Sequence, residues 1–285
     1  ISACLVGSEM CIRDRGVTTV IRGEDHISNT PRQIHIQKAL GYPDLEYAHL
    51  PLVLGEDKKR LSKRHAATSL NAYKEMGFTK ETIINALALL GWSTENEIFS
   101  IDELIESFKL ENVQKAAAVF DLKRFNWVSS QQLAKLDENS FFEVIKPFME
   151  DEDISEDYPN YKKILLAMRT SKTNLKDIAH ATRPFFFELD GYEEKGVKKF
   201  LNESLETLTF ALEVLSKLTE WNETELDMAL IKVRDYFNLP IPKVNQPMRI
   251  ALVGSTVSPS LGLTLELFGK EKSLERIQKA IDFIS

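Results

Sequence analysis

A short basic stretch holds the residues of this sequence best suited to chemistry. Five of the eight residues from Lys58 to His65 are Lys or Arg, and Ser62 lies among them. Lysine ammonium groups neutralise the charge of phosphate oxygens, and a serine hydroxyl can add a hydrogen bond beside them. A loop of this kind could close over a polyphosphate. By composition alone, a solvated basic surface or a nucleic-acid patch is the favoured interpretation.

The basic stretch lies in a chain of 285 residues whose formal net charge is -7. Residues 20–80 carry 10 Lys or Arg against 7 Asp or Glu, a net of +3, whereas residues 81–285 carry 24 against 34, a net of -10. A local positive patch on an acidic chain favours a phosphate site over a general nucleic-acid coat. The hydrophobic content of 43% is typical of a globular protein, and no apolar run is long enough to span a bilayer.

Residues 1–15 differ in character from the rest of the chain. They contain both cysteines, Cys4 and Cys11, and they lack the basic start of a secretion signal. We interpret them as a non-native segment, with a divergent native segment as the alternative. No cysteine follows Gly16, which excludes a cysteine zinc site in that part and fits a reducing cytoplasm.

Elements that could position the basic stretch are predicted before and after it. Val17–Ile21 is β-branched and predicts a strand, and His49–Leu54 is a second candidate. Between them, Thr30 and Pro31 predict the start of a helix that ends at Gly41. We expect the apolar residues of this helix to share a face; they are Ile34, Ala39 and Leu40.

Helices are predicted through most of the remaining chain. The pairs Ser100/Glu103 and Ser129/Gln132 have the spacing of capping boxes. Residues 137–157 hold nine acidic residues and one lysine, which we interpret as a solvated connection between domains. Leucines then recur three or four residues apart, which predicts a buried helix face; they are Leu201, Leu205, Leu208, Leu212 and Leu215. Asn222 with Glu225 predicts another helix start, and Gly254 and Gly269 predict helix ends.

The order of residues adds information that composition lacks. "RLSKR" (Arg60–Arg64) resembles the motif of class I aminoacyl-tRNA synthetases that is usually written KMSKS. "VIRGEDHISNTPRQ" (Val20–Gln33) is more specific and resembles the second half of the glutamyl-tRNA synthetase catalytic domain. "YKEMGFTKETIINALALLGWS" and "VFDLKRFNWV" continue this resemblance to about residue 130. It is weaker beyond, where "PMRIALVGSTVSPSLGLTLELFGKEKSLERI" resembles the end of the bacterial type.

The resemblance implies a mostly α chain. We expect the remnant of a class I Rossmann-type catalytic domain with few strands, then an α-helical stem-contact region, and then an all-α anticodon-binding domain. The expected boundaries are 1–15, 16–125 and 126–285, with the last part divided near residue 200. Residues 140–285 lack the short alternating strands of a β-barrel. This pattern favours the helical bacterial type over glutaminyl-tRNA synthetases and the archaeal-type glutamyl enzymes.

The resemblance also implies a reaction and its partners. ATP, entering with Mg²⁺, and L-glutamate would give glutamyl-adenylate and pyrophosphate, and the glutamyl group would then pass to tRNA(Glu). We expect a cytoplasmic protein, a monomer, with no membrane association and no zinc site in this chain. Family members carry a further N-terminal half with a HIGH-type motif, which is not found here. We therefore expect an N-terminally truncated fragment that is inactive by itself.

Residue roles follow by position from the motif. Lys63 takes the place of the family's ATP-contacting lysine and is the expected catalytic residue, because its charge would stabilise the departing pyrophosphate. The other residues of the ATP-binding loop are Arg60, Leu61, Ser62 and Arg64.

Two further site residues follow from the longer match. Arg22 matches the family arginine that contacts the glutamate substrate, and a guanidinium fork suits a carboxylate. Asp25 falls where the family has an acidic residue near the adenosine of ATP. A local ion pair after a strand is the alternative for both residues. At the level of the whole chain, the alternatives are a non-catalytic tRNA-binding fragment and a ligase that also charges tRNA(Gln) with glutamate.

Overall fold

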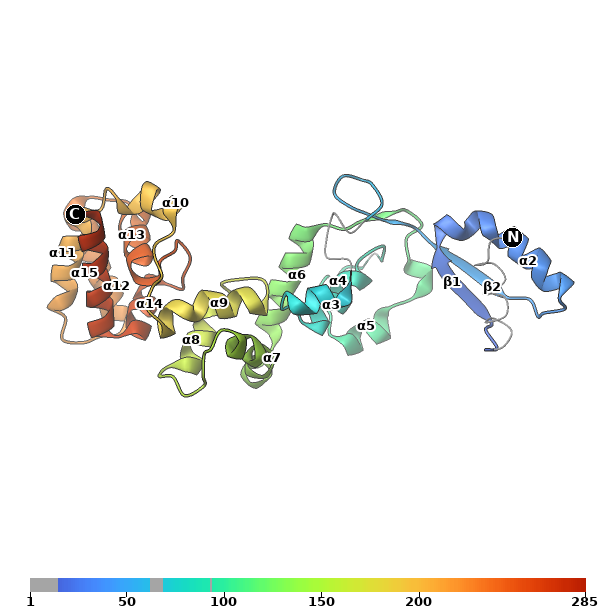
Figure 1. Cartoon of the computed structure of the whole chain (residues 1–285), viewed down its shortest axis with the longest axis horizontal. Helices are drawn as coiled ribbons and strands as arrows, with labels where there is room; N and C mark the ends of the chain where they lie inside the picture. Colours follow the sequence, from blue (N-terminus) through green and yellow to red (C-terminus); the bar gives the residue numbers. More distant parts are fainter. Residues whose placement is uncertain (1–14, 62–68, 93) are drawn as a thin grey trace. The chain divides into compact units, whose positions relative to one another are not determined.

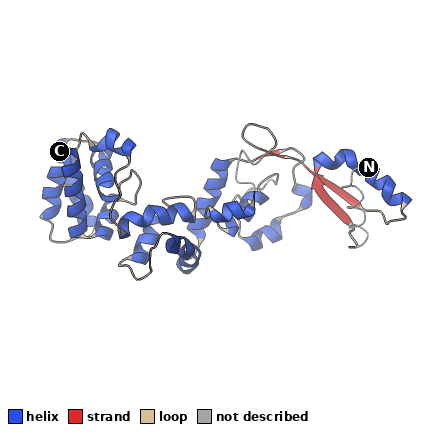
Figure 2. Cartoon of the chain, viewed as in Figure 1, coloured by secondary structure: helices blue, strands red, loops and turns tan. Residues whose placement is uncertain are grey.

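A computed structural model describes residues 15–61, 69–92 and 94–285 of the chain (Figure 1). Residues 1–14, and Ser62, Lys63 and Arg64 of the basic stretch, lie outside the described residues, so the expectation about the first segment stays a prediction. Helices dominate and the few strands are short (Figure 2), which confirms the expected mostly α fold. Within the described part, no helix is both long and apolar enough to cross a membrane.

The chain divides into two units that each have internal packing. The first contains the described part of Ile1–Tyr73 together with Lys80–Val128. The second contains Lys74–Thr79 and Ser129–Ser285.

The first unit begins with a β–helix–β crossover. Strand β1 (Thr19–Gly23) pairs in parallel with β2 (Glu46–Leu50), and Arg22 lies opposite His49 in this register. The connection consists of a 3₁₀ helix, η1 (Glu24–Asn29), and helix α2 (Thr30–Ala39), which has Pro31 in its first turn as predicted. A parallel pair needs such a crossover, and it brings the end of β1 next to the end of β2.

The strand bounds differ from those predicted. β1 begins two residues later than Val17 and continues to Gly23. The single strand expected over His49–Leu54 is wrong: β2 ends at Leu50 and a separate strand, β3 (Val53–Leu54), follows. Pro51 has no N–H for a ladder, and the next amide, that of Leu52, donates to Glu24 Oε1 at 3.2 Å. β3 pairs in parallel with β4 (Ala118–Val119).

Short helices complete the first unit. They are the start of α3 (Leu70–Glu75), α4 (Lys80–Ala88), α5 (Ile101–Ser107), η2 (Leu110–Asn112) and the start of α6 (Leu122–Lys135). The capping box predicted at α5 is confirmed: Glu103 N–H donates to Ser100 Oγ at 3.2 Å, and Ser100 N–H donates to Glu103 Oε2 at 2.7 Å.

The capping box predicted at Ser129 is wrong. Ser129 lies inside α6 and is 1% exposed, and its hydroxyl donates to the Thr173 carbonyl. The helix begins earlier, where Asp121 Oδ1 accepts from the amides of Lys123 and Arg124 at 2.7 and 3.2 Å. Aspartate is a favoured N-cap residue, so the helix begins at Asp121. The spacing of Ser129 and Gln132 therefore occurs by chance inside this helix.

The second unit consists entirely of helices and loops, and all of its residues are described. Its helices are α7 (Glu138–Asp151), α8 (Tyr161–Met168), α9 (Leu175–Phe186), α10 (Glu194–Gly196), the π-helical turn η3 (Val197–Leu201), α11 (Leu205–Ser216), α12 (Glu223–Phe237), α13 (Ile241–Val253), α14 (Leu261–Phe268) and α15 (Lys270–Ile284). The absence of strands in this unit agrees with the prediction that it forms no β-barrel.

The acidic segment 137–157 is not the solvated connection that we expected. Most of it forms α7, whose residues Phe141, Ile145 and Met149 are buried in the core of the second unit. These three positions are four residues apart and form one helix face, so the acidic residues occupy the remaining surface. The number of acidic residues reflects only the solvated face of α7. It does not reveal the apolar face of the same helix.

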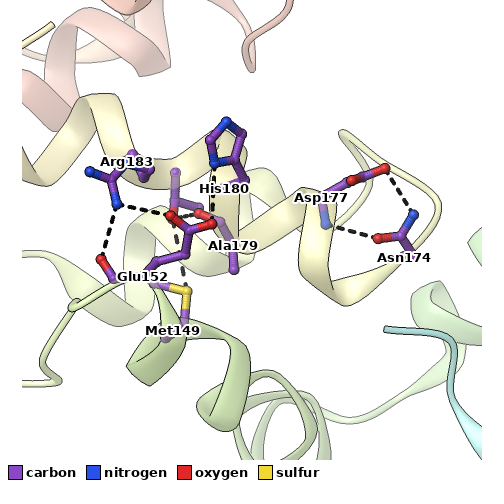
Figure 3. Close-up of polar contacts among 8 residues, drawn as sticks. Met149, Glu152, Asn174, Asp177, Ala179, His180 and Arg183 are labelled. Carbon is purple, nitrogen blue, oxygen red and sulfur yellow. Dashed lines mark hydrogen bonds and ion pairs between the residues drawn. The ribbon is translucent and has the colours of Figure 1, made fainter. Parts of the chain in front are cut away.

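Polar contacts join the end of α7 to α9 (Figure 3). Glu152, directly after α7, has its two carboxylate oxygens 3.1 Å from His180 Nδ1 and 2.9 Å from Arg183 Nη1. At the start of α9, Asn174 Oδ1 accepts from Asp177 N–H at 2.8 Å. Met149 and Glu152 thus contact the same helix, one through the core and the other at the surface.

Most other expectations for the second unit are confirmed. Asn222 caps α12, since its side chain accepts from Glu225 N–H at 3.0 Å. Gly254 and Gly269, both at positive φ, end α13 and α14. The leucine series is wrong as a single helix face, because Leu201 lies in η3 and Leu205 is the exposed first residue of α11.

Candidate active site

The sequence-predicted residues that are described lie on three neighbouring elements of the first unit. Arg22 is on β1, Asp25 is in η1 directly after it, and Arg60 and Leu61 follow a tight turn after β3. Ser62, Lys63 and Arg64 continue from Leu61 outside the described residues, so their expected roles stay predictions.

The guanidinium of Arg22 is half-buried among neutral groups. Its Nη2 donates to Thr30 Oγ1 at 2.7 Å and to Gln33 Oε1 at 2.6 Å, and Nε lies 3.4 Å from His49 Nε2. The guanidinium carbon also lies 5.5 Å from the centre of the Tyr47 ring. These partners fix the position of the cation but do not neutralise its charge. The positive charge therefore stays available for an anion, and a carboxylate matches the fork.

A polar layer between α2 and the sheet holds these partners. The buried residues of α2 are Thr30, Gln33 and Gln37, spaced three and four apart, so this helix turns a polar face inward. Gln37 Nε2 donates to the Tyr47 hydroxyl at 2.8 Å, and the Tyr47 ring stacks with His49. The apolar face that we expected is wrong, and Leu40 is exposed.

Sequence reasoning missed Thr30, Gln33, Tyr47 and His49 as parts of the site. A signal was present in the spacing of Thr30 and Gln33, which places both on one face of a helix. It was overlooked because a buried face is normally sought among apolar residues.

A tight hairpin carries the start of the basic stretch. Gly55 N–H donates to the Lys59 carbonyl at 2.8 Å, Lys58 N–H donates to the Gly55 carbonyl at 2.9 Å, and Leu54 forms a bridge with Arg60. Lys58 has φ of 60°, the left-handed conformation that closes such a turn. Leu61 N–H donates to the Val53 carbonyl at 2.9 Å. This hydrogen bond fixes the position of Leu61, the residue directly before Ser62.

The structure brings Asp25 and Arg60 together. Arg60 Nη2 lies 3.3 Å from Asp25 Oδ2, and the two side chains are 68% and 35% exposed. An exposed pair of this kind contributes little to stability. The pair instead links two parts of the chain, because Asp25 is the second residue after β1 and Arg60 is the first residue of the basic motif.

Gly23 leaves room for the Asp25 carboxylate. A Cβ on Gly23 would lie 2.6 Å from Asp25 Oδ1, although the backbone itself is extended and unstrained. We expect Gly23→Ala to lower the free energy of unfolding by about 1 kcal/mol through this contact, and by much less in an Asp25→Ala background. Urea unfolding of the four chains gives the coupling. An equal cost in both backgrounds would mean that the carboxylate is not what the added methyl meets.

Two domain families and several known proteins match this chain. Residues 9–127 match the family described as "tRNA synthetases class I (E and Q), catalytic domain", and residues 132–281 match "Anticodon binding domain". Glutamate–tRNA ligase from Thermodesulfovibrio yellowstonii is 38% identical over 278 residues, and that from Syntrophotalea carbinolica is 39% identical over 274 residues. The chain belongs to the glutamyl-tRNA synthetase family.

The chain spans about three fifths of these glutamyl-tRNA synthetases. The alignments cover 94% of this chain but 59% and 58% of the two relatives. Solved structures agree in fold: a glutamate–tRNA ligase from Elizabethkingia meningosepticum in complex with its amino acid has a TM-score of 0.75 at 28% identity. A glutamate–tRNA synthetase from Elizabethkingia anophelis has a TM-score of 0.72 at 28% identity. These cover 96% and 95% of this chain, and 59% and 58% of the solved chains.

Proposed function

We propose that this chain supplies the ATP loop, a glutamate contact and the tRNA-binding helices of a ligase that attaches L-glutamate to tRNA(Glu) through glutamyl-adenylate. The observation that carries the proposal is the half-buried Arg22 guanidinium, held by Thr30, Gln33 and His49 without an anionic partner among the described residues. A preorganised fork with a free charge is suited to a substrate carboxylate.

The neighbouring residues suit the ATP half of the reaction. Asp25 is proposed to lie near the adenosine, with Arg60 and Leu61 at the base of the loop that carries Ser62, Lys63 and Arg64. The ion pair between Asp25 and Arg60 supports this assignment, since the two side chains proposed for one site contact each other. ATP would bring Mg²⁺ on its phosphates, as is usual for an ion that keeps several waters.

The second unit is proposed to bind tRNA by the helical route, with no zinc site and no membrane association. We propose that the chain is a cytoplasmic monomer. An all-helical unit matched to an anticodon-binding family supports the RNA assignment. Recognition would then use unpaired bases, whose edges and faces are accessible.

A pyrophosphate-exchange assay tests the ligase assignment. We propose that the isolated chain exchanges no pyrophosphate with ATP and glutamate, whereas a chimera does so when the N-terminal part of the Thermodesulfovibrio yellowstonii relative precedes residue 16. A chimera that folds but stays inactive would favour the alternative, a non-catalytic tRNA-binding fragment. Charging tRNA(Gln) alongside tRNA(Glu) with the same chimera decides whether the ligase accepts both.

Arg22→Gln in the chimera is expected to raise the KM for glutamate about tenfold and to leave the KM for ATP nearly unchanged. The substitution removes the charge that would pair with the carboxylate, and a charge-assisted hydrogen bond is worth about 1.5–3 kcal/mol. Steady-state exchange at varied glutamate measures it. Arg32→Gln, at an exposed position on α2, is the matched control. Equal effects of the two changes would contradict the role of Arg22.

The tRNA affinity of residues 129–285 is expected to depend only shallowly on salt. This part of the chain is acidic, and each phosphate contact adds about 0.7–0.9 to the slope of log K against log salt. Binding of labelled tRNA(Glu) at several salt concentrations gives the slope. A value as steep as about -6 would require many phosphate contacts and would overturn the expectation.

A further inference from the structure

A cavity of about 340 Å³ lies in the first unit, lined by the end of α4 and the loop after it, by β4, and by the start of α6. The buried side chains of its lining are apolar; they are Ala86, Leu89, Trp92, Phe120, Phe125 and Val128. An apolar cavity of about 150 Å³ is enough to hold benzene, so this one has room for two fused rings. None of these residues has a role in the glutamate or ATP chemistry described above.

The indole of Trp92 is a donor without an acceptor. Trp92 is 6% exposed, and its Nε1–H is buried and has no hydrogen-bond partner among the described residues. The Trp92 ring packs against Phe99 and Phe108, with ring centres 5.4 and 5.6 Å away. These rings hold the indole in position, and neither supplies an oxygen to its N–H. Because nearly all buried donors in proteins are paired, the unpaired N–H points to a ligand that carries an acceptor.

The charged groups at the cavity already have partners. Arg124 Nη2 lies 2.7 Å from Glu97 Oε1, and Asp121 Oδ1 accepts from the amides of Lys123 and Arg124. An ionised ligand would have to displace one of these partners and also lose its own hydration. The lining therefore favours a neutral ligand whose polar group is a single acceptor.

We propose that this cavity binds a neutral molecule of two fused rings, at least one of them aromatic, that carries one carbonyl oxygen. The rings lie against the buried apolar side chains, and the carbonyl accepts the hydrogen bond of the Trp92 indole. Apolar walls with a few polar groups that fix orientation are the usual composition of a small-molecule pocket.

The cavity shares a strand with the support of the basic stretch. Ala118 and Val119 of β4 line the cavity, and β4 pairs with β3. Phe120 N–H donates to the Leu54 carbonyl at 2.8 Å, and Leu54 forms a bridge with Arg60. A ligand against β4 therefore acts on the base of the proposed ATP loop. A regulatory effect on that loop rests on the proposed function, whereas binding itself does not.

Titration of the full chain with 1-indanone tests the proposal, with the indole N–H signals followed by proton–nitrogen NMR. The chain has three tryptophans, and Trp92→Phe identifies the signal of Trp92 by its loss. We expect this signal to move downfield and to saturate, because a hydrogen bond deshields the proton. The Trp221 signal should stay, because its N–H already donates to the Leu265 carbonyl at 2.9 Å. No movement at Trp92, or equal movement of both signals, would overturn the proposal.

Matched ligands test the chemistry that the cavity selects. Indane has the same two rings without the carbonyl and is expected to bind about fivefold more weakly, the ratio for one neutral hydrogen bond. Indane-1-carboxylate adds a charge and is expected to bind more weakly than 1-indanone. Equal affinity for indane would show that no acceptor is recognised, and tighter binding of the carboxylate would show an anion site. Either result contradicts the proposal.

A pair of neighbouring variants locates the site. Ala117 lines the cavity and Ala116 does not, although both residues are exposed. Ala117→Leu places extra volume at the lining and is expected to weaken binding of 1-indanone about tenfold, whereas Ala116→Leu should leave it unchanged. Thermal melting checks that both variants are folded. Equal affinities of the two variants would place the ligand elsewhere.

Hydrogen exchange with and without 1-indanone tests the link to the basic stretch. The amides of Phe120 and Leu61 both donate to carbonyls of β3. We expect their exchange to slow at least about threefold more than that of the β1 amides, because the ligand stabilises β4 and β3 locally. Equal slowing in β1 would show general stabilisation of the first unit and would contradict the link.

Discussion

Lys63→Ala in the chimera is expected to slow glutamyl-adenylate formation about 100-fold and to leave tRNA binding nearly unchanged. Negative charge builds on the β and γ phosphates as the bond to the α phosphate breaks, and Lys63 is the ammonium proposed to meet it. Loss of one such preorganised charge costs roughly 3 kcal/mol. The affinity for ground-state ATP should fall much less, because only interactions that strengthen in the transition state raise the chemical rate.

Single-turnover adenylation with ATP and glutamate measures the effect of Lys63→Ala. The control must remove a neighbouring positive charge without disturbing the hairpin. Lys58 has φ of 60°, and asparagine tolerates that conformation better than alanine, so Lys58→Asn is the suitable change. An unchanged rate in Lys63→Ala, or equal slowing in Lys58→Asn, would mean that the loop is only a basic patch.

Arg276→Met is expected to lower the free energy of unfolding of the second unit by about 3 kcal/mol. Arg276 on α15 is 2% exposed and donates to the carbonyls of Leu252 and Phe187, and its guanidinium lies over the Phe268 ring. Burial lowers the pKa of Arg276, because desolvation disfavours the charged guanidinium. Methionine fills much of the space but leaves two buried carbonyls without donors, and each costs about 1–3 kcal/mol.

Urea unfolding followed by circular dichroism measures the loss in Arg276→Met. Lys279→Met is the matched control, because Lys279 lies on the same helix and pairs with Glu188 and Glu275 at the surface. Exposed pairs of this kind contribute at most about 1 kcal/mol. If Arg276→Met costs no more than Lys279→Met, the two carbonyls find other donors and the buried arginine is not a structural requirement.

The fold was predictable wherever a local signal was sufficient. Ser100 with Glu103 and Asn222 with Glu225 cap real helices, because a cap depends on residues within one turn. Ser129 with Gln132 has the same spacing inside a helix that Asp121 had already started. The same pair of residue types is therefore a start signal only where no helix precedes it.

The roles of the candidate site residues stay predictions, and the contacts around these residues were not predicted. Arg22, Asp25 and Arg60 were identified through the family resemblance, whereas composition alone favoured a solvated surface for the basic stretch. Contacts such as Arg22 with His49 depend on the parallel register of two strands separated by a crossover. Such a register is set by tertiary packing, so no local pattern in the sequence contains it.

The polar inward face of α2 limits how far the thermal stability of this protein can be raised by mutation. Thr30, Gln33 and Gln37 occupy positions where aliphatic side chains would bury more apolar surface, so a search for thermostable variants would select replacements there. The same replacements would remove the acceptors that orient Arg22. Under the role proposed for Arg22, a core-filling redesign should therefore leave this helix face unchanged.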